Sequence, residues 1–335
     1  MSIEKKSSGV YTKELLRGQI LTVKGIMSPE KMGMTLPHEH LIIKHQGPDV
    51  DIVDVDLVIE DIKKYVAAGG RTLVEMTNEK IGRDPAAFKR ISEETGLNVI
   101  MGCGYYKDAW IPYEARNKTA DVIAQEIVND IFIGVPVDGE YIHSGQIGEI
   151  GISRNMTQIE ENSLRGSARA QKATGAALSI HFDFNTTDRE YDHILKILDE
   201  EGVDNHRVVF NHVMAKIDDI DRIIRLAKTG VNLTFDNFGI EIDDRMVKFM
   251  SIPMEEQLVT IKALLKFGLI DHMMLSQDVC FKGCLTANGG FGYTHLLDHI
   301  VPFLHKLNIN DYDIERMIIF NARKVFTFGG RYPSY

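Results

Sequence analysis

The sequence of 335 residues lacks the features expected of a secreted or membrane protein. Its three cysteines, Cys103, Cys280 and Cys284, show no disulfide or structural-zinc spacing, which indicates a reducing compartment. No apolar run reaches the about 18 residues that a membrane span requires, and residues 1–8 lack the apolar core of a signal peptide. We therefore expect a cytoplasmic protein that does not enter a membrane.

The sequence also lacks an excess of positive charge. Its formal net charge is −10, which argues against nucleic acid as a partner because phosphate binding needs a basic surface. Hydrophobic residues make up 44% and charged residues 26%, as in ordinary globular proteins. This length fits one large α/β barrel or two smaller domains.

Short apolar runs alternate with amphipathic stretches along the chain. The runs predict eight strands: Gly33–His40, Arg71–Thr77, Asn98–Gly104, Gln146–Gly151, Ala177–Phe182, Arg207–His212, Val231–Asp236 and His272–Asp278. The amphipathic stretches repeat apolar residues every three or four positions, which predicts helices. These are Asp56–Ala68, Pro85–Thr95, Ala120–Ile133, Ile159–Ala173, Asp188–Glu201, Asp218–Lys228, Glu255–Phe267 and a helical set from Thr294 to Phe326.

Strand alternating with helix predicts a parallel sheet, and eight such units predict a closed (β/α)8 TIM barrel of the α/β class. No linker or shift in composition divides the chain, so we expect residues 1–335 to form one domain. Residues 1–30 would be an N-terminal extension, in which Gln19–Ile26 predicts a β-hairpin.

Polar residues gather at the ends of the predicted strands. His38 and His40 end the first strand and lie on the same face of it, because alternate strand side chains share a face. Further candidates on later strands are Glu149, His181, His212 and Asp278. The active site of such a barrel lies at the C-terminal ends of its strands, so we expect these six side chains to meet. The other histidines are interpreted as structural or exposed: His45, His143, His193, His206, His272, His295, His299 and His305.

Four imidazoles and two carboxylates suit two divalent metal ions, Zn²⁺ first, with Mn²⁺ or Co²⁺ as alternatives. His38, His40 and Asp278 lie on neighbouring strands of a closed barrel and would hold one ion. The second ion would be held by His181 and His212, and Glu149 would bridge the two ions through its two oxygens. The alternative is that each residue has a structural role, as a carboxylate paired with Lys or Arg or as a histidine packed in the core.

Seven stretches match a known family in order and spacing: residues 35–41 (TLPHEHL), 102–106 (GCGYY), 148–153 (GEIGIS), 179–181 (SIH), 210–212 (FNH), 275–278 (LSQD) and 287–293 (ANGGFGY). On these motifs the chain resembles the phosphotriesterase family of the amidohydrolase superfamily over nearly its whole length. The resemblance implies a binuclear metal-dependent hydrolase with the same six residues as metal ligands.

The sequence departs from the family pattern at two places. Many members bridge the metals with a carbamylated lysine, but residues 141–153 contain no lysine. The chain therefore resembles a glutamate-bridged, lactonase-like branch, with Glu149 as the bridge. Some members carry a proton-relay aspartate just after the sixth strand, where this chain has Val213, Met214 and Ala215.

The mechanism that the resemblance implies is attack by a metal-bridging hydroxide on an ester-type centre. Asp278 would act as general base towards the hydroxide and then as general acid towards the leaving alkoxide. Tyr106 resembles the family tyrosine beside the hydroxide, and a contact at the rim of the site is its alternative role.

Several cations follow the predicted strands: Lys44, Lys107, Lys216, Arg245, Lys248 and Lys282. As a group they favour an anionic small-molecule substrate, and ordinary solvated surface charge is the alternative. We expect a lactonase that opens phosphorylated furanose lactones. The alternatives are an organophosphate hydrolase, an acyl-homoserine lactonase and a non-catalytic metal-containing binding protein. From the family we also expect a homodimer.

Overall fold

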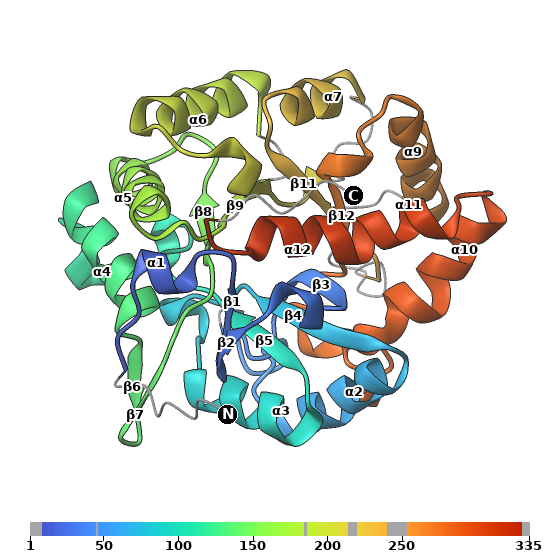
Figure 1. Cartoon of the computed structure of the whole chain (residues 1–335), viewed down its shortest axis with the longest axis horizontal. Coiled ribbons are helices and arrows are strands. Elements are labelled where there is room, and N and C mark those ends of the chain that lie inside the picture. The colour runs from blue at the N-terminus through green and yellow to red at the C-terminus, as the bar shows by residue number, and fades with distance from the viewer. Residues whose placement is uncertain (1–8, 45, 184–185, 214–219, 240–252, 330–335) are drawn as a thin grey trace.

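The computed structural model describes residues 9–44, 46–183, 186–213, 220–239 and 253–329. Within these ranges, eight parallel strands lie in the middle of the molecule and helices surround them (Figure 1). The strands are β3 (Met34–Glu39), β4 (Gly70–Glu75), β5 (Asn98–Met101), β8 (Ile147–Ile152), β9 (Leu178–Phe182), β10 (Val208–Phe210), β11 (Asn232–Phe235) and β12 (Met273–Leu275). They confirm the eight predicted strands, most of which are shorter than predicted.

Backbone pairing divides these strands into two sheets, ordered β3-β4-β5 and β8-β9-β10-β11-β12. Two seams join the sheets. Between β5 and β8, the Gly148 amide donates to the Cys103 carbonyl at 2.7 Å. Between β12 and β3, the His38 amide donates to Ser276 Oγ at 3.0 Å, and the Asp278 amide donates to the His38 carbonyl at 3.3 Å. The strands therefore surround a common axis, as the predicted (β/α)8 barrel requires.

Helices cover the outside of the barrel. They are α2 (Val55–Ala67), α3 (Pro85–Thr95), α4 (Ala120–Phe132), α5 (Gln158–Thr174), α6 (Asp188–Glu201), α7 (Ile220–Lys228) and α9 (Met254–Lys266). The predicted C-terminal helical set is divided into α10 (Val301–Lys306), α11 (Asp311–Glu315), α12 (Asn321–Phe326) and two π-helical turns, Leu296–Ile300 and Arg316–Phe320. No helix within the described ranges is both long and apolar enough to cross a membrane.

The ends of the helices follow from local sequence. Thr157 and Glu160 form a capping box at the start of α5, in which each side chain accepts the other residue's backbone amide. Thr187 and Glu190 do the same at the start of α6. Gly202 ends α6 in the left-handed conformation, with φ 70°, which a glycine adopts at low cost.

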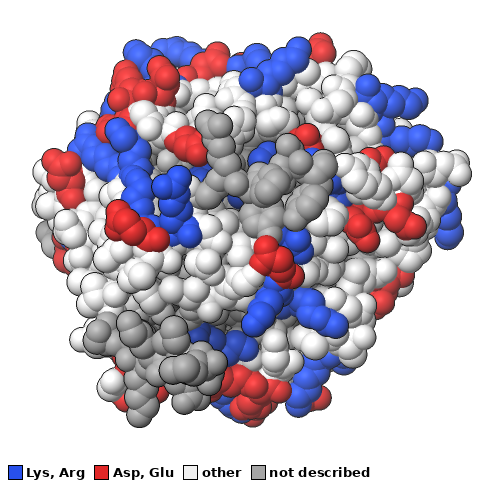
Figure 2. Space-filling view, viewed as in Figure 1, with Lys and Arg blue, Asp and Glu red and all other residues white. Residues whose placement is uncertain are grey.

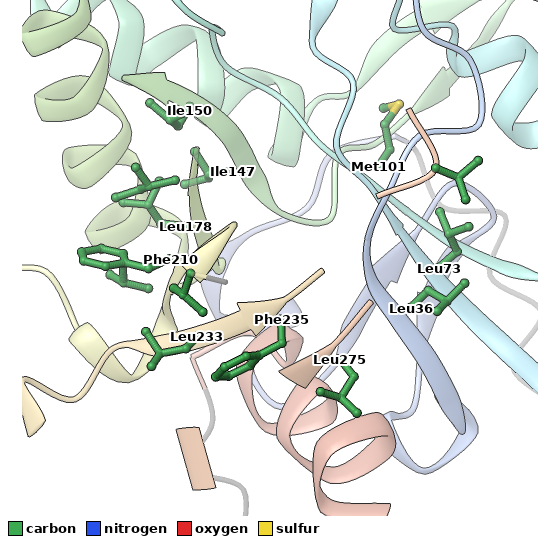
Figure 3. Packing of buried hydrophobic residues seen from close by; sticks show 14 of the residues in the cluster. Leu36, Leu73, Met101, Ile147, Ile150, Leu178, Phe210, Leu233, Phe235 and Leu275 are labelled. Carbon is green, nitrogen blue, oxygen red and sulfur yellow. The ribbon is translucent and has the colours of Figure 1, made fainter. Parts of the chain in front are cut away.

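The main hydrophobic core lies between the strands and the helices. Every strand of the barrel contributes to it, and the residues labelled in Figure 3 are Leu36, Leu73, Met101, Ile147, Ile150, Leu178, Phe210, Leu233, Phe235 and Leu275. A smaller cluster joins Ile20, Val325 and Phe326 to Val74 and Val209 of the strands. α12 therefore packs across the barrel, as Figure 1 shows.

Two antiparallel hairpins accompany the barrel. The first pairs β1 (Ile20–Thr22) with β2 (Gly25–Met27) and confirms the predicted N-terminal hairpin, which follows the short helix α1 (Lys13–Leu16). The second pairs β6 (Val135–Val137) with β7 (Glu140–Ile142) and was not predicted.

Basic and acidic side chains are interspersed on the face that carries α12 (Figure 2).

Candidate metal centre

The six predicted ligands converge at one end of the barrel. His38 lies on β3, Glu149 on β8 and His181 on β9, whereas His40, His212 and Asp278 lie just beyond the ends of β3, β10 and β12. All six are buried, and none is more than 8% exposed. They were predicted because each is a polar residue at or near the end of a predicted strand, and the structure brings all six together.

Glu149 lies between the histidines and faces them with both oxygens. Its Oε2 lies 3.1 Å from His181 Nδ1, 3.5 Å from His38 Nε2 and 3.8 Å from His212 Nε2. Its Oε1 lies 3.7 Å from His40 Nε2. A carboxylate placed in this way can contribute one oxygen to each of two neighbouring ions.

Asp278 approaches the two histidines of the first strand. Its Oδ1 lies 3.5 Å from His38 Nε2 and 3.4 Å from His40 Nε2. Two ligand atoms on one tetrahedral zinc ion lie about 3.3 Å apart, since each bond is about 2.0–2.1 Å long. Asp278 Oδ1 therefore lies from each of the two imidazoles at about the separation of two ligand atoms on one ion.

Unpaired buried atoms give an independent test of that fit. Neither ring nitrogen of His38 has a hydrogen-bond partner within the described part of the chain, and neither does Asp278 Oδ1. Leaving such groups buried and unpaired costs about 1–3 kcal/mol each. A bound cation would satisfy His38 Nε2 and Asp278 Oδ1. Three sets of residues have ligand atoms within 4.8 Å of one another: His38, His40 and Glu149; His38, His212 and Asp278; Glu149, His181 and His212. The residues present can hold metal ions.

The electrostatics differ among the six residues. Burial acts to lower the pKa of His38 and His212, but the Asp278 carboxylate raises the pKa of His38 to about 9 and the Asp236 carboxylate raises that of His212 well above its usual value. These two imidazoles would therefore release a proton on binding a metal.

Burial acts to raise the pKa of Glu149, but the imidazoles of His181, His212 and His38 around it outweigh burial and hold that pKa well below its usual range. Burial likewise acts to raise the pKa of Asp278, but the neighbouring imidazoles of His38 and His40 outweigh burial and lower it. Burial and the ammonium of Lys107 lower the pKa of His181 to about 3, so this ring is neutral.

Residues behind the ligands fix the orientation of the rings. Asp236, just after β11, lies 3.1 Å from His212 Nδ1 and accepts a hydrogen bond from the His212 amide at 3.1 Å. The other oxygen of Asp236 is 3.6 Å from His38 Nδ1. On the opposite side, Thr77 Oγ1 lies 2.8 Å from His40 Nδ1 and donates to Glu75 at 2.6 Å. Such partners set which nitrogen carries the proton and which binds the metal.

Two of the candidate ligands have strained backbones. His212 has φ 57° and Asp278 has φ 55°, although neither is a glycine. Residues other than glycine rarely adopt this left-handed conformation, which persists when surrounding contacts enforce it and is common at functional sites. For His212 one such contact is the hydrogen bond from its amide to Asp236.

Glu39 lies between the two histidines of the first strand and points to the opposite side. It accepts hydrogen bonds from Ser276 Oγ at 2.7 Å and from the amides of Gln277 and Val279 at 2.8 and 2.7 Å. These bonds join β3 to the chain after β12 and so hold His38 beside Asp278. Asp236, Thr77, Glu75 and Glu39 were not predicted, although Asp236 ends a predicted strand as several ligands do.

Tyr106 contacts a ligand directly. Its hydroxyl lies 3.1 Å from His181 Nε2, and the two rings meet edge to face at 4.8 Å. When His181 Nδ1 binds a metal, its proton resides on Nε2 and points at the tyrosine oxygen. Lys107 lies over the Tyr106 ring at 5.5 Å and forms an ion pair with Asp183.

The other predicted cations are not gathered at the centre in the part of the chain that the structure describes. Lys44 and Lys282 are exposed. Lys216, Arg245 and Lys248 lie outside the described residues.

The phosphotriesterase family model matches residues 18–326 of the chain. The chain belongs to the phosphotriesterase family. An N-acetyltaurine hydrolase of Xenopus tropicalis is 31% identical, with 93% of this chain and 99% of that protein covered.

Two solved structures of similar proteins share this fold. A resiniferatoxin-binding protein from Rhodobacter sphaeroides has a TM-score of 0.86 and 34% identity, with 93% of this chain and 96% of that one covered. The phosphotriesterase homology protein from Escherichia coli, complexed with phosphate in its active site, has a TM-score of 0.80 and 30% identity, with 88% and 99% covered. As a phosphotriesterase-family member, the chain is a metal-dependent hydrolase with a (β/α)8 barrel.

Proposed function

We propose that this family member is a binuclear hydrolase that opens the lactone ring of a phosphorylated furanose. The observation that carries the binuclear proposal is the position of Glu149, which faces His38, His181 and His212 with one oxygen and His40 with the other. His38, His40 and Asp278 would hold one ion, and His181 and His212 the other. Zn²⁺ is the first choice, with Mn²⁺ and Co²⁺ as alternatives.

Two bound ions would supply an activated water and polarise the oxygen of the scissile bond. The protein's own residues would do the rest. Asp278 is ionised and can accept the proton of the attacking water on a carboxylate oxygen, then return it to the leaving alkoxide as the ring opens. Tyr106 has its hydroxyl beside His181 and is proposed as a second catalytic residue at the same rim.

An anionic substrate is supported by cations in the loops that follow the strands. Lys107 lies beside Tyr106, so its ammonium is near the metal centre even though Asp183 pairs with it. We propose that Lys44, Lys216, Arg245, Lys248 and Lys282 add to this attraction. The phosphate in the active site of the Escherichia coli relative supports the same substrate class.

A second candidate is hydrolysis of the amide bond of an N-acyl amino sulfonate. It is favoured by the N-acetyltaurine hydrolase of Xenopus tropicalis, which matches nearly the whole of this chain. This substrate is also anionic, and the same centre would attack an amide carbonyl. Phosphotriesters and acyl-homoserine lactones remain alternative substrates.

A substrate panel on the zinc-loaded protein tests these proposals. It comprises a phosphorylated γ-lactone, the same lactone without phosphate, N-acetyltaurine, an acyl-homoserine lactone and a phosphotriester. The first proposal expects the highest kcat/KM for the phosphorylated lactone, with Asp278→Asn losing turnover of it. A higher kcat/KM for N-acetyltaurine would replace the first proposal with the second, and turnover of neither compound would reject both substrate proposals.

A further inference from the structure

A cavity of about 500 Å³ lies between the end of β8 and the first half of α6, and none of the six candidate ligands lines it. One wall follows β8, beginning at Ile152, three residues after Glu149. The other wall is the first half of α6, up to Ile194. The cavity is large enough for a small organic molecule, since ligand sites commonly measure about 300–1,000 Å³.

Two arginines without a partner line this cavity. Within the described ranges, neither Arg154 nor Arg189 forms a salt bridge or a side-chain hydrogen bond, and both are exposed. His193, one turn after Arg189 on α6, also lines the cavity. Most other arginines in the structure are paired, as Arg222 and Arg225 are with Asp188.

The nearby carboxylates are engaged elsewhere. Glu190 lines the cavity, but it accepts hydrogen bonds from the amides of Asn155 and Thr187 at 3.0 and 2.6 Å. Asp188 is held by the arginines of α7, and Asp183 by Lys107 and the Arg154 amide. The charge of Arg154 also helps to lower the pKa of Glu190, but neither Arg154 nor Arg189 forms an ion pair with a carboxylate of the described residues, so both guanidinium groups can contact a ligand.

A second cavity of about 220 Å³ provides a contrast. It is lined by Arg83 and Lys118, but each already has a carboxylate partner: Asp130 at 2.6 Å and Glu126 at 2.6 Å. Its cations stabilise the fold around it. Only the larger of these two cavities presents unpaired cations.

We propose that the larger cavity binds the oxyanion group of a small organic molecule, a phosphate, sulfonate or carboxylate. The guanidinium groups of Arg154 and Arg189 would contact the oxyanion, because each offers two parallel N–H donors that match its geometry. Ile152 and Ile194 are buried in the wall and would contact an apolar part of the molecule.

The cavity is also connected to the metal centre through contacts of its lining. Asp183 accepts the Arg154 amide at 2.8 Å and pairs with Lys107, which lies over Tyr106, and Tyr106 contacts His181. The anion therefore has two sources: the anionic end of the substrate itself, or a separate small anion. Both use the same binding chemistry, and kinetics separates them.

Isothermal titration of the zinc-loaded full chain with phenylphosphonate tests the proposal. This probe combines an oxyanion with an apolar ring, and its carbon–phosphorus bond is not hydrolysed. Arg154→Gln and Arg189→Gln are each expected to weaken binding at least tenfold, about 1.4 kcal/mol. Arg17→Gln, which removes an exposed arginine elsewhere, serves as the control for lost charge and should bind as the wild type does.

Two results would overturn the site: equal affinity in the wild type and the Arg154→Gln/Arg189→Gln double variant, or loss of binding in Asp278→Asn alone. The second result would place the probe at the metal centre. If the site holds the substrate's own anion, Arg154→Gln raises KM for an anionic substrate and not for a neutral lactone. If it holds a separate anion, neither KM changes while phenylphosphonate binding is lost. The titration needs no turnover, so its outcome is independent of the proposed function.

Discussion

Asp236 holds two of the candidate ligands from behind, through His212 Nδ1 and the neighbouring His38 ring. We expect Asp236→Asn to lower zinc affinity by about 10–100-fold, because an amide orients the imidazoles less strongly than a carboxylate. Competition with a chromogenic chelator measures the change. Asp221→Asn, an exposed change elsewhere, should leave zinc affinity unaltered. Equal affinities in both variants would remove Asp236 from the centre.

Tyr106→Phe tests the role of a single hydroxyl, because the aromatic ring and its packing against Trp110 remain. If the hydroxyl takes part in catalysis, kcat falls while two zinc ions stay bound. If it only orients His181, one ion is lost on dialysis and added zinc restores kcat. Metal analysis beside steady-state kinetics separates the two roles. Unchanged kcat and unchanged zinc content would exclude both.

The six candidate ligands could be predicted from the sequence because each lies on a strand or just after one, where alternation and strand ends fix the direction of a side chain. Asp236 also lies at the end of a predicted strand, but it was not predicted because none of the family motifs contains it and no histidine is next to it in the sequence. The positions of the loop cations were harder to predict, because no sequence periodicity constrains the direction of an exposed lysine. Lys107 was placed by its ion pair with Asp183, which sequence spacing does not reveal.

At the scale of elements, α12 stabilises the barrel by packing Phe326 against the interior of the strands. Phe326→Ala should lower the free energy of unfolding by about 3–5 kcal/mol, the usual cost of truncating a buried phenylalanine. Urea unfolding measures it. Phe267 is 61% exposed at the end of α9, so Phe267→Ala is the matched control and should cost little. A similar loss in both variants would contradict the packing argument.

The order and type of the main elements followed from hydrophobic periodicity, but two features did not. The hairpin β6–β7 escaped prediction because each strand has only three residues, although Asp138-Gly139 between them is a strong turn signal. The C-terminal helical set was predicted as helical from Thr294 to Phe326, but its π-helical turns Leu296–Ile300 and Arg316–Phe320 were not predicted. A π-helical turn changes the pattern of backbone hydrogen bonds, and the spacing of apolar residues in the sequence does not reveal this change.

For the whole molecule, bound metal should stabilise the fold, because an ion that binds only the folded chain adds to the free energy of unfolding. Removing the metal with a chelator should lower Tm and abolish activity, and added zinc should restore both. At a free zinc concentration of 1,000 Kd, one site contributes about 4 kcal/mol. Differential scanning calorimetry tests this. His38→Asn should show a smaller zinc-dependent shift, and an unaltered Tm in the wild type would contradict the metal site.

The assembly is a further prediction at this scale. We propose that residues 1–335 act as one domain and associate as a homodimer, with no nucleic-acid or membrane partner. Light scattering should then give twice the 37.8 kDa mass of a single chain. A mass equal to that of one chain at all accessible concentrations would contradict the dimer.

The position of Glu149 has a consequence for how the centre fills. Its two oxygens belong to one rigid carboxylate, so an ion that fixes one oxygen also fixes the other, already aimed at the opposite set of histidines. The first ion thereby prepares the second half of the site. Loading should be cooperative, with a sigmoidal zinc titration and little of the singly occupied protein at any point along it.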